Sequence, residues 1–363
     1  MRLKVCVTSE NLHLMPDPLF ASRLPRPFIF LILISSLLAT TACGLFTKPK
    51  KVQVPQLLKP LAEANKVLLL NEINRLATVR SIQGKIDIQF EDTSFAESGI
   101  VEKYRQTEGT LVLQRPGKIY LGIQFSFVDI AQMSSDGERF RVAVLRGDEK
   151  YKRFVKGTNN AVYPRLEETS VPKDPKKPKP QNESEAVSAL SNLRPQHLTD
   201  ALMIQPAGDA NLVYVQSEFF QEEADSTPQA KKDTRVVRGY YLLEEFTQPS
   251  GGEARLIRRF WFDRVKAIRL ARVQFFDDQG LLITDVSYSN ETAFGEGAKY
   301  RLPSRIEITR PHDQYKLTIA YQAPTTVEVD KEFRPEAFVL ENSGQLPEID
   351  LDERLRKRAA PAP

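Results

Sequence analysis

Cysteine, histidine and tryptophan are all scarce in this chain. Its 363 residues include two cysteines, three histidines and one tryptophan. Because both cysteines, Cys6 and Cys43, lie near the N-terminus, the rest of the chain has no thiol from which to form a disulfide or a paired-cysteine metal motif. We therefore expect an apolar core and sheet hydrogen bonds to stabilise the fold without covalent cross-links.

Residues that carry chemistry are few as well. After residue 42 only His197 and His312 remain of the histidines, and both are interpreted as surface or helix-capping residues. The sequence has no Gly-x-Ser-x-Gly elbow, no phosphate-cradling glycine loop and no His-Glu-x-x-His. Asp277 and Asp278 come just before Gly280, which is typical of a hairpin turn. We expect no catalytic residue, no metal site and no cofactor.

A large excess of one charge is also absent. The formal net charge is +4, from 51 basic and 47 acidic residues. A chain so nearly balanced lacks the basic surface that nucleic-acid binding requires, so no nucleic-acid partner is expected. Its length suits one generous domain, as in many all-β proteins.

A short apolar run opens the chain. Residues 28–39 are almost all apolar and follow Arg23 and Arg26, which is the pattern of a secretory signal peptide. The run is shorter than the roughly 20 residues that a membrane-spanning helix needs. Residues 1–42 are therefore predicted to be a signal peptide, with either Met1 or Met15 as its start.

The residues Thr40-Thr41-Ala42-Cys43 resemble the bacterial lipobox, with Thr40 in place of the usual leucine. The resemblance implies that Cys43 carries a diacylglycerol thioether and anchors the mature chain to a membrane outside the cytoplasm. Residues 43–56 would then be a lipidated tether. Gly44 stands where some inner-membrane lipoproteins have aspartate, which favours the periplasm-facing outer membrane. The alternative is a soluble secreted protein cut after Ala42.

Apolar periodicity predicts one helix followed by many strands. Apolar residues between Leu57 and Val79 fall on one face at helical spacing. After Gly84 the period drops to two, which predicts strands with one apolar face. Turns at Pro116-Gly117 and Asp136-Gly137 predict hairpins. The strands predicted in the first half cover residues 86–90, 110–114, 119–127, 140–144 and 151–155.

The second half is predicted to be a meander. Successive strands with short turns indicate antiparallel pairing, because parallel pairing needs longer crossovers. These strands cover residues 212–220, 236–246, 256–263, 268–276, 281–288, 305–310 and 315–321.

Three other segments complete the predicted domain organisation. Residues 167–185 are rich in proline and charge and predict a disordered insertion. Residues 186–204 predict two short helices broken at Pro195, acting either as a lid or as simple packing elements. The charged tail 341–363 is expected to be flexible and to stay outside the core. The folded domain therefore covers residues 57–340.

Several motifs in this order resemble the LolA/LolB-like family of outer-membrane lipoprotein carriers and sorting proteins. The best match is Gly-Thr-Leu-Val-Leu-Gln-Arg-Pro-Gly-Lys at 109–118, which looks like the family's strand, Arg-Pro-Gly turn and strand. Asp136-Gly137 follows at the next hairpin. Later matches are Trp261-Phe262-Asp263, the turn 277–280, and Leu302-Pro303 before Ile306 and Ile308. The resemblance spans residues 57–340.

The resemblance implies a mainly β fold: a strongly curved, incomplete antiparallel β-barrel, or half-barrel, with an N-terminal helix and short lid helices. Such proteins hold acyl chains against the concave apolar face, where each buried methylene contributes about 0.8 kcal/mol. Each lining candidate could equally be ordinary core. The lipid-binding candidates are Ile119, Leu121, Ile123, Phe125, Phe140, Val142, Phe260, Phe262, Ile306 and Ile308.

The implied partners are a membrane, through the N-terminal lipid, and the acyl chains of lipid or lipoprotein cargo. Two other functions stay open. One is an anchored envelope interaction or stress-sensor module that binds a protein partner, and the other is a purely structural lipoprotein. A continuous apolar cavity would favour the carrier.

Overall fold

The computed structural model describes residues 54–359, apart from 94–101, 164–192, 226–229, 249–252 and several shorter gaps. The predicted signal peptide, Cys43, most of the tether and the insertion 167–185 lie outside the described residues. None of the helices in the described part of the chain has both the length and the apolar character needed to cross a membrane.

One large sheet contains all seventeen strands recorded among the described residues. In spatial order its main course is β9 (Leu212–Ala224), β10 (Arg235–Thr247), β11 (Leu256–Asp263), β12 (Arg269–Phe276), β13 (Leu282–Phe294), β14 (Tyr300–Arg310), β15 (Tyr315–Tyr321), β2 (Ser81–Asp92), β4 (Thr107–Gln114), β5 (Lys118–Phe125), β6 (Val128–Asp136), β7 (Arg139–Val144), β8 (Arg153–Thr158) and β17 (Glu348–Asp350). The short strands β1 (Gln56–Leu57), β3 (Glu102–Lys103) and β16 (Glu328–Val329) pair beside β10 and β2.

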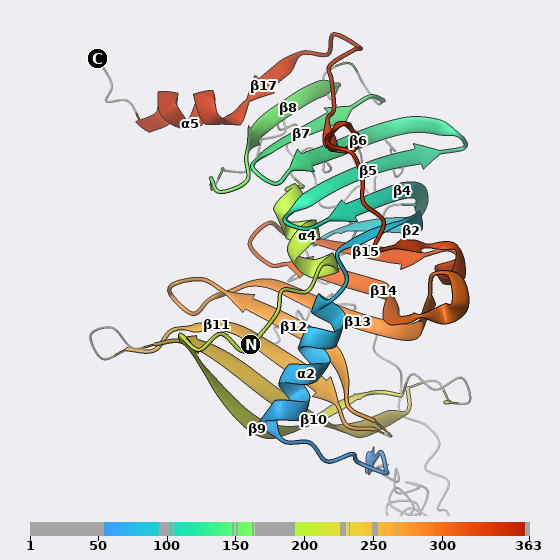
Figure 1. The fold of residues 1–363 in the computed structure, drawn as a ribbon, viewed down its shortest axis with the longest axis vertical. Coiled ribbons are helices and arrows are strands. Elements are labelled where there is room, and N and C mark those ends of the chain that lie inside the picture. Colours follow the sequence, from blue (N-terminus) through green and yellow to red (C-terminus); the bar gives the residue numbers. More distant parts are fainter. Residues whose placement is uncertain are drawn as a thin grey trace, which may run out of the picture. The chain divides into compact units, whose positions relative to one another are not determined.

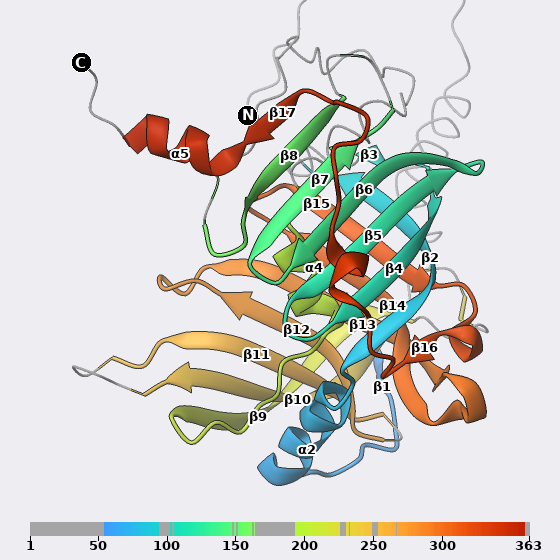
Figure 2. The ribbon, with the colours of Figure 1, turned by 45° about the horizontal axis from the view of Figure 1, so that its top comes forward.

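The sheet is open. Within the described residues no pairing joins β9 to β17, the two ends of the strand order. Register shifts in four of its hairpins, such as the one between Trp261 and Phe262, add bulges that bend the strands. Figure 2 shows the sheet curving around the side on which helices α2 and α4 lie. The predicted mainly β, incompletely closed architecture is therefore confirmed.

The join between β2 and β15 brings distant parts of the chain together. These strands pair antiparallel, with Ile88 opposite Ile319 and Ile86 opposite Tyr321. The predicted meander holds on both sides of this join. Two short pairings at the margins, β1 with β10 and β17 with β8, are parallel, which the prediction of antiparallel pairing missed.

Two helices cover the concave face (Figure 1). Helix α2 (Lys66–Ala77) begins after Asn65, whose side chain accepts a hydrogen bond from the Leu68 amide and so caps the helix. Helix α4 (Pro195–Leu202) begins with proline, whose missing N–H is not needed there. Both bury apolar residues in the same core as the strands. Three 3-10 turns, η3 (Glu296–Ala298), η4 (Pro324–Thr326) and η5 (Pro335–Phe338), connect strands along the sheet.

Two predicted segments differ from the structure. The helix predicted from Leu57 begins only at Lys66, because Leu57 belongs to β1 and Asn65 supplies the cap. The tail does not stay outside the core: β17 pairs with β8 and leads into helix α5 (Leu351–Ala359). Leu351 is buried in the main core and Ile349 packs against it, so these two side chains and the β17–β8 pairing tie down a segment whose average composition is strongly polar.

Candidate functional site

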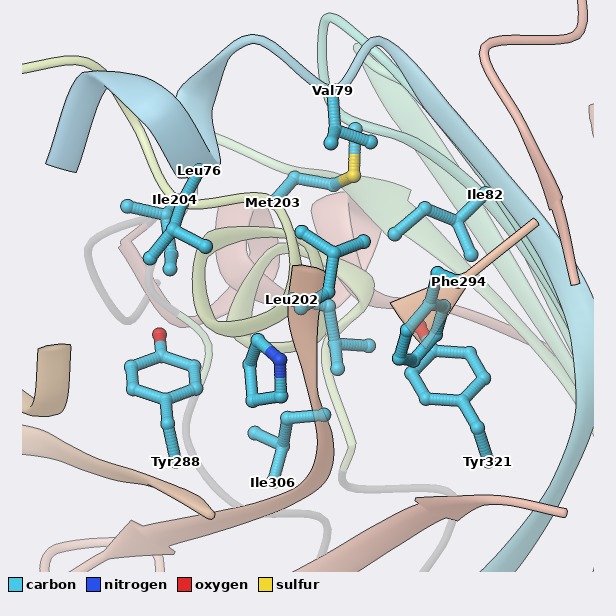
Figure 3. Close-up of a pocket in the computed structure, with 12 residues that line it drawn as sticks. Leu76, Val79, Ile82, Leu202, Met203, Ile204, Tyr288, Phe294, Ile306 and Tyr321 are labelled. Atoms are coloured by element: carbon cyan, nitrogen blue, oxygen red, sulfur yellow. The ribbon is translucent and has the colours of Figure 1, made fainter. Parts of the chain in front are cut away.

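An apolar cavity of about 30 Å³ lies where the C-terminal ends of α2 and α4 meet the concave face of the sheet. Figure 3 shows side chains converging on it from both helices and from the strands beneath. No charged side chain among the described residues lines it. The lining residues are Leu76, Val79, Ile82, Leu202, Met203, Ile204, Tyr288, Phe294, Leu302, Pro303, Ile306 and Tyr321.

The size of the cavity limits what it holds in this conformation. A water molecule needs roughly 10–15 Å³ measured in this way, so about two waters fit and an acyl chain does not. A larger apolar guest therefore requires α2 or α4 to move away from the sheet.

Arg115 holds the two helices together at their C-terminal ends. Its Nε donates to the Val79 carbonyl, just after α2, at 2.9 Å, and its Nη2 donates to the Ile204 carbonyl, just after α4, at 2.6 Å. A third bond joins Nη1 to Oε1 of Gln205 at 3.3 Å. Burial lowers the pKa of Arg115. One side chain from the turn between β4 and β5 thus ties both covering helices to the sheet.

Two further contacts support this closure. Asn74 on α2 exchanges a pair of hydrogen bonds with the Ala207 backbone, at 2.9 and 3.0 Å. The Tyr288 hydroxyl donates to the Ala201 carbonyl of α4 at 2.8 Å. A few hydrogen bonds therefore hold the helices to the sheet around the apolar side chains that pack between them.

A second cavity, of about 370 Å³, lies beside the N-terminal half of α4; because its wall carries charged and amide side chains beside apolar ones, we call it the polar cavity. In its wall, Arg310 donates from Nε to Asp313 at 2.7 Å and from Nη1 to the Thr284 hydroxyl at 2.6 Å. His197 Nδ1 lies 3.2 Å from the Tyr315 hydroxyl. The lining residues are Asn159, Asn160, Ala161, Tyr163, Arg194, Gln196, His197, Asp200, Phe275, Ile283, Thr284, Arg310 and Asp313.

Two titratable groups of this polar cavity, His197 and Asp200, have strongly shifted pKa values. Burial, helped by the nearby Arg310, lowers the pKa of His197 to about 3. Burial also raises the pKa of Asp200 to about 6, against the opposing pull of Arg258 and Arg310. The interpretation of His197 as a surface or capping residue was wrong, because its ring lies in the cavity wall. His312 is exposed in the β14–β15 turn, as predicted.

The lipid-binding candidates from the sequence lie mostly within the packed core. Nine of the ten belong to the main apolar core, and Phe125 is half-buried with the Arg105 guanidinium 4.8 Å from its ring centre. Of the ten, Ile306 lines the apolar cavity. A role of the other nine in ligand contact stays a prediction.

Sequence reasoning missed most of the cavity wall. Leu202, Met203 and Ile204 stood in a segment predicted as helical, but no spacing rule shows which residues face a gap. Tyr288 lies on a predicted strand, and so does Tyr321. Because tyrosine carries both an apolar ring and a polar hydroxyl, the alternation of apolar and polar residues does not show that these side chains point into the core. Arg115 stood in the best-matching motif without an assigned role.

Two exposed apolar features lie elsewhere on the molecule. Phe127 is 96% exposed at the β5–β6 hairpin tip, with a left-handed φ of 68°. Strand β9 pairs only with β10 in the described residues and leaves Val213, Val215, Phe219 and Phe220 between 40% and 48% exposed. Within the same described part of the chain, no group of three or more His, Cys, Asp or Glu residues could hold a metal ion.

Comparison with known proteins finds similarity in structure alone. No family model matches the chain, and no curated protein matches it. A LolA superfamily protein from Nitrosomonas europaea is 10% identical with a TM-score of 0.39, covering 76% of this chain and 99% of that one. A DUF1329 family protein from Desulfovibrio piger is 13% identical with a TM-score of 0.36, covering 76% and 95%.

A third solved structure is a domain described as an outer membrane lipoprotein-sorting protein, from Vibrio parahaemolyticus. It is 11% identical with a TM-score of 0.36, covering 74% of this chain and 95% of that one. The proteins found include members of the family that the sequence resembles. At these identities and TM-scores, the likeness says nothing about what this chain binds.

Proposed function

We propose that this chain is a non-catalytic lipoprotein that binds acyl chains of lipid or lipoprotein cargo between the concave sheet face and helices α2 and α4. Cys43 anchors it to the outer membrane, facing the periplasm. The observation that carries the proposal is the set of Arg115 hydrogen bonds, which holds two helices over a cavity whose described lining residues are all uncharged.

Burial of an acyl chain provides free energy toward moving α2 and α4 away from the sheet. Releasing Arg115 breaks three hydrogen bonds, each with a net contribution of about 0.5–1.5 kcal/mol, or somewhat more for a charged donor. An acyl chain that buries about ten methylenes returns about 8 kcal/mol. Opening also breaks the bonds of Asn74 and Tyr288 and uncovers the apolar faces of α2 and α4, and burial of the acyl chain against those faces offsets part of this cost.

The test uses the chain from residue 44 onward, exported to a bacterial periplasm and purified without detergent. Native mass spectrometry should find co-purified acyl lipid, and a fluorescent fatty acid should displace it. Met203→Trp, which fills the cavity, should abolish both signals at an overpacking cost of about 1–3 kcal/mol. The matched control is Val128→Trp at an exposed site. A folded chain that is free of lipid and does not bind the probe would refute the proposal.

The edge strand β9 favours a second candidate function, an anchored envelope module that binds a protein partner. An unpaired thirteen-residue edge with exposed apolar side chains is a surface to which a partner's strand can add. A photoreactive residue at Val215 should then cross-link a defined envelope protein, whereas one at the equally exposed Leu281 should not. Equal labelling from both positions would exclude this candidate.

A further inference from the structure

One polar atom in the apolar cavity has no partner. Tyr321, the last residue of β15, points its ring into the cavity and packs edge-on against Phe294, with ring centres 5.1 Å apart. Its hydroxyl is buried, and no hydrogen-bond partner for it exists among the described residues. Figure 3 shows Tyr288 and Tyr321 rising from the sheet on either side of Ile306.

The neighbouring tyrosines show that this is unusual for the molecule. In the same cavity the Tyr288 hydroxyl donates to the Ala201 carbonyl, and in the polar cavity the Tyr315 hydroxyl meets His197. Buried polar groups are nearly always paired because an unpaired one loses its bonds to water. Phenylalanine at 321 would pack as well without that loss, so the hydroxyl calls for a role in binding.

The chemistry of the cavity defines what the hydroxyl would bind. Burial raises the pKa of Tyr321, so the phenol stays protonated and can donate. Within the described part of the chain no charged side chain lines the cavity, so an ionised carboxylate there would be buried without a counter-ion. The matching group is a neutral acceptor carried on an apolar chain, which in acyl compounds is the carbonyl oxygen of an ester.

We propose that the Tyr321 hydroxyl donates a hydrogen bond to the carbonyl oxygen of a neutral acyl ester, so that the site selects esterified acyl chains over plain hydrocarbon. This inference rests on the proposed acyl-chain binding and adds its substrate class. Water can satisfy the hydroxyl in the ligand-free protein, and an entering ester carbonyl would replace that water and keep the bond.

The test compares two probes that differ only in the carbonyl group. The full chain carrying Cys43→Ala is titrated with methyl palmitate and with methyl hexadecyl ether, each displacing the fluorescent hydrocarbon diphenylhexatriene. The protein should bind the ester about five- to tenfold more tightly than the ether, which is the effect of one net hydrogen bond. Tyr321→Phe should bring this ratio to about one while leaving ether affinity unchanged.

Tyr288→Phe is the matched control. Its hydroxyl already serves Ala201, so its loss should change the affinity for both probes together and leave their ratio intact. In the infrared spectrum, the carbonyl stretch of bound carbon-13 methyl palmitate should shift to lower frequency in the parent chain and return in Tyr321→Phe. Melting curves of both variants establish that they fold.

The outcomes distinguish a failure of the Tyr321–ester hydrogen bond from a failure of acyl-chain binding. Equal binding of ester and ether by the parent chain would overturn the role of Tyr321 and leave acyl-chain binding standing. A preference that survives Tyr321→Phe would likewise overturn it. Failure of the parent chain to bind either probe would refute acyl-chain binding itself, and the inference with it.

Discussion

The two ends of helix α4 lie in opposite environments. At its C-terminal end the walls are apolar and leave about 30 Å³, and three hydrogen bonds from Arg115 close the cover. At its N-terminal end the walls carry charges and amides around about 370 Å³. There the charged Arg310 and Asp313 already satisfy each other.

The difference teaches that the roomier cavity is not the better site for an apolar guest. Hydrocarbon in the polar cavity would lie against charged and amide groups, whereas opening the nearly filled cavity offers the guest the apolar faces of both the helices and the sheet. Under the proposed function, an acyl chain enters only when α2 or α4 moves away from the sheet.

Releasing the helices over the apolar cavity should have the largest effect on the difference between the two ends of α4. Arg115→Ala removes its three closing hydrogen bonds and should lower the free energy of unfolding by about 3 kcal/mol. Diphenylhexatriene should bind this variant faster, because the cover is less firmly held. Urea denaturation and stopped-flow fluorescence check both, with Arg139→Ala, exposed on β7, as the control. Unchanged stability would show that Arg115 does not close the site.

Enlarging the apolar end without touching its polar bonds should have the next largest effect. Leu202→Ala leaves a hole beside the cavity and should cost about 2 kcal/mol, because the side chain is only partly buried. Added diphenylhexatriene should restore much of that loss by filling the hole. Leu281→Ala, at an exposed turn, should show neither effect in thermal melts. If the probe stabilises both variants equally, the hole is not its binding site.

The polar end should respond to pH. Because burial raises the pKa of Asp200 to about 6, above the unfolded value, its stabilising protonated form is present at pH 4 and is lost as pH rises through 6. Asp200→Asn should therefore gain stability relative to the parent chain over that range, by about 2 kcal/mol at pH 7. Urea titrations at a series of pH values check this.

The Asp200 experiment must be separated from the titration of the neighbouring His197 and compared with a surface carboxyl. His197 contributes in the opposite direction, since burial depresses its pKa to about 3 and its stabilising neutral form is lost as pH falls. Comparing Asp200→Asn with the parent chain at each pH isolates the carboxyl. The exposed Asp278→Asn serves as the surface control. A pH-independent difference between Asp200→Asn and the parent would refute the assignment.

The smallest effect should separate the two tyrosines of the apolar end. Tyr321→Phe removes a hydroxyl without a protein partner and should change the free energy of unfolding by less than about 0.5 kcal/mol, or raise it slightly. Tyr288→Phe loses the bond to Ala201 and should cost about 1 kcal/mol. Urea denaturation of the ligand-free variants distinguishes them. Equal losses would mean that Tyr321 is paired after all.

Much of the fold could be predicted from local pattern. Strands β11 and β15 match the predicted ranges residue for residue, because turn residues flank both and apolar residues alternate along β15. The pairing of β2 with β15 could not be predicted, since it depends on how far the sheet curves before the chain returns. The tail was misread because its average composition hides the few apolar contacts of Leu351 and Ile349 and the pairing of β17 with β8.

The sequence by itself determined a mainly β chain with apolar-faced strands and turns in place, and it predicted an exported N-terminus and no catalytic residue. Only the tertiary structure decided where a gap remains in the core, that Arg115 closes it, and that the Tyr321 hydroxyl faces it alone. The reason is physical. Alternation records which side of a strand is buried, but a cavity and an unpaired atom are what remains after every other side chain has packed.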